Sequence, residues 1–161
     1  MSTAQPSQPQ TLLFINNKYV PAKSGKTFAT VNPSTGQTIA HVAEADVVDV
    51  EAAVDAAYAA FHNVWKNVPG EGRARLMHKL ADLIDANAEA LGKLETADNG
   101  LLYVTAGRGA PAGAAMWLRH FAGYADKITG TTQSLVDGSL FGLSVFEPLG
   151  VVAAIVNNNK Q

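Results

Sequence analysis

The stretch EPLGVVAAIVNNNKQ, residues 147–161, decides the fold. Val151 to Val156 form an unbroken apolar run, which is typical of a strand buried on both faces of a sheet. Such strands belong to parallel sheets covered by helices, and crossover helices connect them to their neighbours. After the run come only three asparagines, a lysine and a glutamine. The sequence therefore predicts an α/β fold in which this strand was built for partners that the chain does not supply beyond it.

The composition is that of a globular protein. With 161 residues, of which 47% are apolar and 16% charged, the chain is long enough for one domain with a sizeable core. A formal net charge of -2 gives no electrostatic basis for binding nucleic acid or an anionic membrane. The longest apolar run is too short to span a bilayer. Residues 1–10 resemble neither a signal nor a transit peptide, so we expect a disordered tail and a cytoplasmic protein.

Residue types that often carry chemistry are scarce. The sequence has no cysteine, which excludes disulfides, thiolate zinc sites and a cysteine nucleophile within this chain. Its four histidines lie far apart, with no second histidine or paired carboxylate at ligand spacing. We therefore expect surface histidines rather than a metal-histidine site.

The chain opens with a β pattern between Thr11 and Ala43. Asn16-Asn17 separates LLFI from Tyr19-Val20, and the sequence NPSTG at Asn32 to Gly36 separates TFATV from QTIAHVA. Asparagine, proline and glycine at these positions are typical of tight turns. Antiparallel pairing is the expectation for this segment.

Apolar residues at three- and four-residue steps then predict three helices. The first follows Asp46, the second runs from about Arg73 to Thr96, and the third from about Pro111 until Gly130. Asp49 falls largely outside the apolar stripe of the first helix. The apolar positions are Val47, Val50, Val54, Tyr58, Phe61 and Trp65 in the first helix and Leu76, Met77, Leu80, Leu83, Ile84, Leu91 and Leu94 in the second.

A glycine-rich stretch and a hairpin complete the pattern. GRGAPAGAA, residues 107–115, does not match the dinucleotide-binding fingerprint, because no strand precedes it and the glycine spacing differs. Its small residues favour close helix packing. Gln133 to Val136 and Leu140 to Phe146 flank the turn residues Asp137-Gly138, which predicts a β-hairpin.

Four blocks carry a family resemblance. They are FINNKYVPAKSGKTFATVNPSTGQTIAHVAEA, LETADNG, LRHFAGYADKITG and FEPLGVVAAIV, in that order within residues 11–156. Together they resemble the amino-terminal part of an NAD(P)-dependent aldehyde dehydrogenase. The resemblance implies an incomplete part of that fold. Residues 11–130 would be the amino-terminal part of the cofactor-binding domain, 131–146 an oligomerisation hairpin, and 147–161 the first buried strand of the cofactor-binding sheet with a truncated end.

The resemblance implies oxidation of an aldehyde to a carboxylic acid with NAD or NADP. In the family a cysteine thiolate attacks the aldehyde, the nicotinamide takes the hydride, and a glutamate activates water. The cysteine and glutamate segments of the family lie beyond the positions that this chain matches. We therefore expect the chain to be inactive by itself.

Site residues follow only where positions match. The family continues after its buried strand with Pro-Trp-Asn, and these positions hold Asn157, Asn158 and Asn159 here. The resemblance makes Asn159 an oxyanion donor, with terminal disorder as the alternative. It places Ile155, Val156, Asn157 and Asn158 beside the cofactor, although the first two are equally compatible with ordinary strand positions.

Two further sites rest on the same resemblance. Thr30, Val31 and Asp98 match positions that hold a monovalent cation in some members, although Asp98 before Asn-Gly also suits the end of a helix. The helix at Gly113 to Trp117 matches one that borders the substrate entrance. Core packing of Trp117 is the alternative interpretation there.

Two alternatives to the enzymatic function remain open. Residues 131–146 could pair with full-length subunits or with further copies of the chain, because an exposed hairpin edge accepts another strand. The chain would then be a non-catalytic interaction module. Alternatively the chain is a non-functional truncated product. A truncation, an alternative transcript end or a misjoined gene model would each explain why the family pattern breaks off after Val156.

Overall fold

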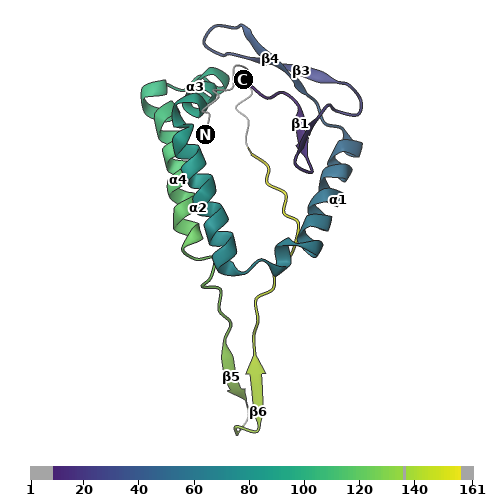
Figure 1. Cartoon of the computed structure of the whole chain (residues 1–161), viewed down its shortest axis with the longest axis vertical. Helices are drawn as coiled ribbons and strands as arrows, with labels where there is room; N and C mark the ends of the chain where they lie inside the picture. Colours follow the sequence, from purple (N-terminus) through teal and green to yellow (C-terminus); the bar gives the residue numbers. More distant parts are fainter. Residues whose placement is uncertain (1–8, 136, 157–161) are drawn as a thin grey trace.

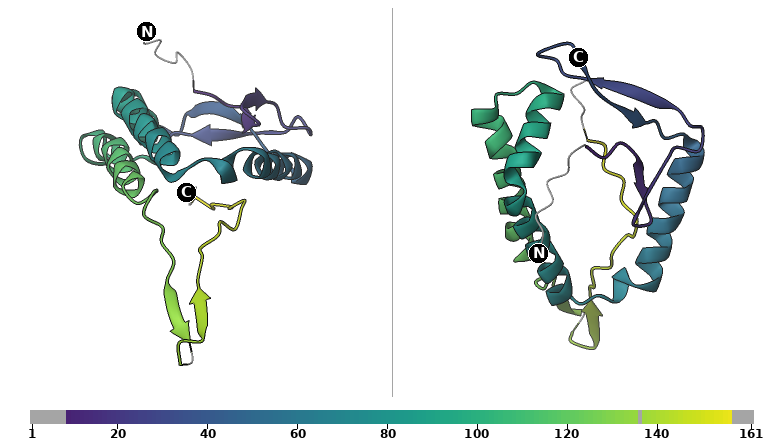
Figure 2. Two further views of the ribbon diagram at one scale, coloured as in Figure 1. Left: turned by 60° about the horizontal axis from the view of Figure 1, so that its bottom comes forward. Right: turned by 45° about the horizontal axis from the view of Figure 1, so that its top comes forward.

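The computed structural model describes residues 9–135 and 137–156. Helices α2, α3 and α4 stand together on one side, α1 lies on the other, and the β3–β4 hairpin lies at one end between them (Figure 1). The β5–β6 hairpin projects from the opposite end, away from the rest (Figure 2). In order, the elements are β1 (Leu13–Ile15), β2 (Lys18–Val20), β3 (Thr27–Val31), β4 (Thr38–Ala43), α1 (Val47–Asn63), the 3-10 turn η1 (Trp65–Asn67), α2 (Gly70–Ala86), α3 (Ala88–Asn99), the π-helical turn η2 (Tyr103–Gly107), α4 (Arg108–Ala122), β5 (Thr132–Leu135) and β6 (Leu140–Leu143).

The antiparallel pairing predicted between Thr11 and Ala43 is confirmed, in the form of two hairpins. β1 pairs with β2 around Asn16 and Asn17, whose φ angles of 50° and 60° lie in the left-handed region that asparagine tolerates. β3 pairs with β4 around the turn that Asn32 opens, where Gly36 has φ +70°. The ladder of this second hairpin has an irregularity between Thr30 and Val31.

Helix α1 begins directly after Asp46, as the sequence predicts. The Asp46 carboxylate accepts from the N–H of Val47, and Asp46 and Asp49 form a capping box. Asp49 is nevertheless only 3% exposed, in contrast to the expectation that it lies outside the apolar stripe. Burial of this carboxylate is tolerated because it accepts the backbone N–H groups of Lys23 and Asp46, each at 3.0 Å.

The prediction of one continuous second helix between Arg73 and Thr96 is wrong. Asn87 divides it into α2 and α3, so residues 9–135 and 137–156 contain four α-helices instead of the three predicted. Asn87 has φ -111° and ψ 12°, and its side-chain amide donates to the carbonyl of Leu83 at 2.8 Å. Asparagine favours helix ends because its side chain competes for backbone hydrogen bonds. The apolar periodicity continues across this break, which is why periodicity alone does not reveal it.

Helices α2 and α4 pack against each other through small residues. Ala81, Ala115 and Ala122 are 0%, 1% and 2% exposed. A methyl group at Gly70 would come within 2.5 Å of the Ala125 carbonyl oxygen, so the start of α2 touches the backbone after α4. The predicted leucine stripe of α2 is not enclosed by this contact, because Leu76, Leu80 and Leu83 are each about half exposed.

The third predicted helix is shorter than expected at its far end. It appears as α4, which starts at Arg108 instead of Pro111 and ends at Ala122 instead of Gly130. The turn η2 leads into it and passes against α3, where a Cβ on Gly92 would overlap the Gly107 carbonyl. This confirms that the small residues around position 107 permit close packing.

The predicted hairpin over residues 131–146 is confirmed as β5–β6. Its strands pair from Thr132 with Leu143 to Leu135 with Leu140. At its base, the hydroxyls of Thr131 and Ser144 lie 2.7 Å apart. Gly138 has φ +90° at the tip, a conformation that glycine adopts without steric cost.

The prediction of a buried strand over Val151–Val156 is not confirmed. This segment has no strand assignment, and none of the described strands pairs with it. Val152, Ile155 and Val156 are 81%, 100% and 81% exposed. A strand of a parallel sheet is buried on both faces because neighbouring strands pair with it and helices cover the sheet. Within residues 9–135 and 137–156, the run VVAAIV lacks both.

Candidate functional site

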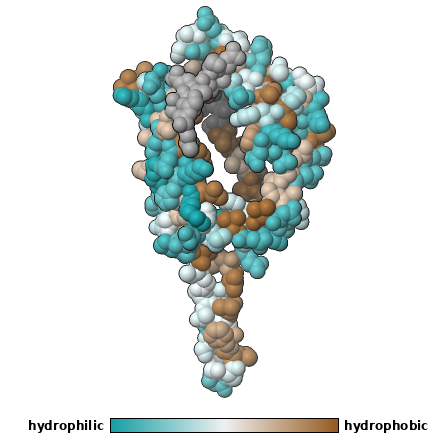
Figure 3. All heavy atoms as spheres, in the orientation of Figure 1, coloured by the Kyte–Doolittle hydropathy of each residue, from teal (hydrophilic) through white to brown (hydrophobic). Residues whose placement is uncertain are grey.

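A groove of about 710 Å³ lies between the β3–β4 hairpin and the helices on the other side of the molecule. Phe28 and Val42 come from the hairpin, Leu91 and Leu94 from α3, and Ala114 from α4. Figure 3 shows that apolar residues also gather around the hollowed centre of the visible face and along the β5–β6 hairpin. The groove is therefore mainly apolar, with a few polar groups in its wall.

The polar groups of the groove include a contact between β3 and α3. The Thr30 hydroxyl donates to the Asp98 carboxylate, with 2.6 Å between Oγ1 and Oδ1. Glu95 lines the same groove one turn earlier on α3, and its carboxylate accepts from the Asn99 side-chain amide at 2.6 Å. Two of the three residues proposed for the cation, Thr30 and Asp98, are thus in direct contact.

Local backbone structure brings these groups together. The irregularity in the β3–β4 ladder falls at Thr30 and Val31, and such irregularities change the direction of neighbouring groups. Gly100 ends α3 with φ +75°, and a Cβ there would come within 2.8 Å of Pro33 in the β3–β4 turn. Glycine at position 100 therefore allows both the end of the helix and the close approach of the turn.

This arrangement suits a hard cation better than a transition metal. Asp98 lies in the last turn of α3, where the partial negative charge of the helix terminus favours a cation. Carboxylate and backbone oxygens are ligands for hard ions. In the described part of the chain, no group of three or more His, Cys, Asp or Glu side chains could hold a metal.

The predicted cofactor residues do not form an enclosed site here. Ile155 and Val156 lie in the extended and exposed segment, and neither lines the groove described above. Asn157, Asn158 and Asn159, including the predicted oxyanion donor, lie outside the described residues. Among the described residues, the predicted cofactor positions therefore show no arrangement that fits a bound dinucleotide.

The segment Gly113 to Trp117 presents different faces of α4. Ala114 lines the groove, whereas Ala115 is buried and Trp117 is 54% exposed. The Trp117 ring stacks on Phe121 with 5.9 Å between centroids. Trp117 therefore does not pack in a core in this structure, in contrast to the alternative that the sequence left open, and only part of the segment could border a substrate.

Sequence reasoning missed Glu95 as a groove residue. The spacing of Glu95 and Asp98 places both carboxylates on one face of α3, a signal that the sequence contains.

The residues whose pKa values are shifted lie on other surfaces. A hydrogen bond from Lys93, together with its charge, lowers the pKa of Glu89, and hydrogen bonds to Asp82 and Asp85 raise the pKa of Arg119. None of these groups lines the groove.

Comparison with known proteins identifies the fold. The pattern of the Aldehyde dehydrogenase family matches residues 19–160. An aldehyde dehydrogenase of Enchytraeus buchholzi is 47% identical over 147 residues, which are 90% of this chain and 29% of that protein. The mitochondrial aldehyde dehydrogenase of Sus scrofa is 45% identical over 146 residues, or 89% of this chain and 28% of that protein. The chain therefore spans less than a third of the length of these relatives.

Solved structures similar to this chain also belong to aldehyde dehydrogenases. The NAD+ complex of the Bacillus cereus aldehyde dehydrogenase superposes with a TM-score of 0.76 at 39% identity, over 80% of this chain and 26% of that one. The NAD-dependent aldehyde dehydrogenase of Sinorhizobium meliloti gives 0.79 at 31% identity, over 88% of this chain and 29% of that one. These structures and the curated relatives confirm the α/β fold class and the NAD(P) cofactor of the family.

No helix in the described part of the chain combines the length and apolarity needed to cross a membrane. The arrangement of β3–β4, α2, α3 and α4 around the groove is part of a known fold, and the sequence match extends over nearly all of the chain. The chain therefore belongs to the aldehyde dehydrogenase family.

Proposed function

We propose that this chain forms part of an enzyme that oxidises an aldehyde to a carboxylic acid with NAD or NADP. The observation that carries the proposal is its likeness to the NAD+ complex of the Bacillus cereus enzyme over 80% of the chain. The sequence contains no cysteine, so it cannot supply the thiolate that attacks the aldehyde. The chain alone is therefore expected to be inactive, and its cytoplasmic location remains part of the proposal.

A chimera tests the catalytic proposal. Residues 19–156 would replace the matching segment of a full-length relative, and NADH formation would be followed after addition of an aldehyde. Turnover by the chimera, with none by the chain alone, is the expected result. A chimera that assembles normally but does not turn over would contradict the proposal. As a control, the same chimera without its catalytic cysteine must be inactive.

The groove adds a structural role to this proposal. The Asp98 carboxylate with the backbone carbonyls of Thr30 and Val31 would hold a monovalent cation between β3 and α3. The Thr30–Asp98 contact and the position of Asp98 at the end of α3 support it. Thermal unfolding in potassium chloride and in tetramethylammonium chloride of equal ionic strength tests it. A higher Tm in potassium, lost in Asp98→Asn, is expected, and equal Tm values would contradict the site.

The β5–β6 hairpin favours assembly as a second function. Leu140, Phe141 and Leu143 are all more than half exposed on a two-stranded sheet whose outer edges carry no described strand. Such an edge accepts a strand from another subunit. The chain would thereby join further copies of itself or full-length subunits, with residues 131–146 at the interface.

Native mass spectrometry tests this second function. The chain would be measured alone and mixed with a full-length aldehyde dehydrogenase from the same source, with NADH formation followed in parallel. Mixed oligomers that disappear in Phe141→Lys would support assembly through the hairpin. A matched substitution away from it, Tyr58→Lys on α1, should leave the oligomers unchanged. Absence of mixed oligomers would contradict co-assembly without affecting the catalytic proposal.

A further inference from the structure

The sequence contains two places where an aspartate or asparagine directly precedes glycine. These are Asn99-Gly100 at the end of α3 and Asp137-Gly138 at the tip of the β5–β6 hairpin. At such pairs the backbone nitrogen of glycine can attack the preceding side chain, because glycine has no Cβ to obstruct the approach. The two pairs differ in exposure and in the hydrogen bonds that hold their side chains and glycine N–H groups.

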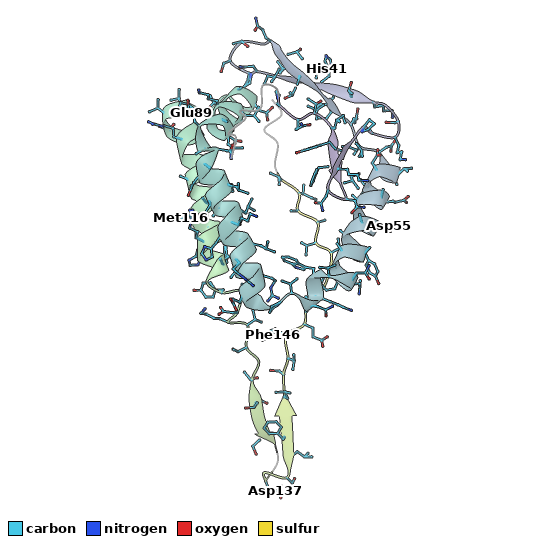
Figure 4. The ribbon with its side chains drawn as sticks, in the orientation of Figure 1. His41, Asp55, Glu89, Met116, Asp137 and Phe146 are labelled. Atoms are coloured by element: carbon cyan, nitrogen blue, oxygen red, sulfur yellow. The ribbon has the colours of Figure 1, made fainter. Side chains whose placement is uncertain are left out.

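Asp137 is open to this reaction. Both Asp137 and Gly138 are exposed, and Figure 4 shows Asp137 at the end of the hairpin farthest from the helices. The carboxylate accepts the N–H of Ser139 at 3.3 Å, a long bond that reaches across Gly138. Among the described backbone contacts, none uses the Gly138 N–H as donor. Both residues that would react are therefore exposed to solvent, and the hydrogen bond that holds the carboxylate is long.

Asn99 is held away from the same reaction. Its side-chain amide donates to Glu95 at 2.6 Å, and its oxygen accepts the N–H of Leu101 at 2.8 Å. The Gly100 N–H donates to the Thr96 carbonyl at 3.0 Å, and Pro33 packs against Gly100. The Gly100 N–H bond to Thr96 and the Asn99 amide bond to Glu95 must break before Gly100 can displace ammonia, so the reaction requires local opening of the end of α3.

We propose that Asp137 is a site of spontaneous isoaspartate formation and that the fold protects Asn99 from the corresponding loss of ammonia. At Asp137, the Gly138 nitrogen forms a bond to the side-chain carboxyl carbon. The C–OH bond of the protonated carboxyl group breaks, and its hydroxyl leaves as water together with the amide proton. A five-membered succinimide results. No oxidant or other reactant is needed.

Hydrolysis of the succinimide completes the modification. Water added at the side-chain carbonyl restores aspartate, whereas water added at the backbone carbonyl breaks the original peptide bond. The chain then continues through the side-chain carbon, and the free carboxylate lies at the α position. The backbone gains one carbon beside the Leu135–Leu140 pair, which disturbs the β5–β6 register. The product is a substrate for enzymes that methylate isoaspartyl carboxylates.

Peptide mapping of the aged protein tests the proposal. The purified full chain would be incubated at neutral pH in heavy-oxygen water, natively and in denaturant. Isoaspartate at residue 137 would be identified by electron-transfer fragmentation and by methylation with an isoaspartyl methyltransferase. Asn99 conversion would be identified by its mass change. In the native protein, Asp137 is expected to convert faster than Asn99. Conversion of Asn99 should be slower in the native protein than in the denatured chain by about tenfold or more.

Internal controls make the result decisive. In the denatured chain Asn99 should react faster than Asp137, because ammonia leaves an amide more readily than water leaves a carboxylic acid. Asp126 is exposed like Asp137 but precedes Lys127, so it should stay unmodified. Asp137→Glu keeps the charge but would require a six-membered ring, so the signal should disappear. Equal rates for Asn99 in the native and denatured chains, or no isoaspartate at residue 137, would overturn the proposal.

Discussion

Thr30 Oγ1 donates to Asp98 Oδ1 over 2.6 Å and so connects strand β3 to the last turn of helix α3, although 68 residues separate the two in the sequence. With the Pro33–Gly100 contact beside it, this bond joins the β3–β4 hairpin to the helical side of the molecule. Thr30 and Asp98 both line the groove between the hairpin and the helices, so this junction forms part of its wall.

Removing the hydroxyl should weaken this junction. We expect Thr30→Val to lower the free energy of unfolding by about 1 kcal/mol, because a partly exposed hydrogen bond to a carboxylate contributes on that scale. Urea unfolding followed by circular dichroism measures the change. Thr27→Val, on an exposed position of the same strand, is the matched control. An equal loss in both variants would show that the Asp98 contact has no special role.

The buried carboxylate of Asp49 predicts a larger effect. Asp49→Ala leaves the N–H groups of Lys23 and Asp46 without their acceptor and removes half of the α1 capping box. We expect a loss of about 2 to 3 kcal/mol in the free energy of unfolding. Asp55→Ala, on an exposed position of α1, should change stability by less than about 0.5 kcal/mol. Urea titrations of both variants provide the comparison.

Two glycines should respond in opposite directions to the same substitution. In Gly92→Ala the new methyl group would overlap the Gly107 carbonyl, and we expect a loss of about 1 to 3 kcal/mol. In Gly109→Ala the methyl group meets nothing within 4 Å, so stability should stay constant or rise by up to about 0.5 kcal/mol. Thermal unfolding distinguishes the two. Similar behaviour would contradict close packing between α3 and η2.

The Glu89–Lys93 pair predicts a pH dependence with a definite sign. The Lys93 hydrogen bond at 2.6 Å, and then its charge, lower the pKa of the Glu89 carboxyl. A carboxyl whose pKa is lower in the folded state stabilises the fold above its unfolded pKa, and this contribution disappears as pH falls through the folded pKa. NMR titration of the side-chain carboxyl should show the lowered midpoint. Lys93→Met should return it to the ordinary range, and an unchanged midpoint would exclude the pair in solution.

Local sequence signals predicted the parts of the fold that depend on neighbouring residues. The asparagines of the first turn, the cap at Asp46 and the glycine of the hairpin tip each favour one backbone conformation whatever lies nearby. The divided second helix shows where such reasoning fails. Asn87 is one residue among many good helix formers, and its effect depends on whether its amide reaches the Leu83 carbonyl.

Burial was harder to predict than secondary structure. The leucines of α2 repeat with helical periodicity, but α4 contacts α2 through alanines, so the leucines remain half exposed. The run VVAAIV has the composition of a buried strand, but burial is a property of its neighbours, and no described element covers it. Of the predicted cation residues, Thr30 and Asp98 lie in contact, and only the family resemblance related these two distant segments. Cation binding itself stays a prediction.

The guanidinium of Arg73 binds the chain both before α2 and after α4, donating to the carbonyls of Val68 at 2.6 Å and Ala125 at 3.0 Å. The β5–β6 hairpin leaves the molecule a few residues beyond Ala125, so its base is fastened to the α2–α4 pair. The hairpin therefore extends from a base that the two Arg73 hydrogen bonds tie to these helices. If α4 rotated relative to α2, the tip of the hairpin would move farther than its base.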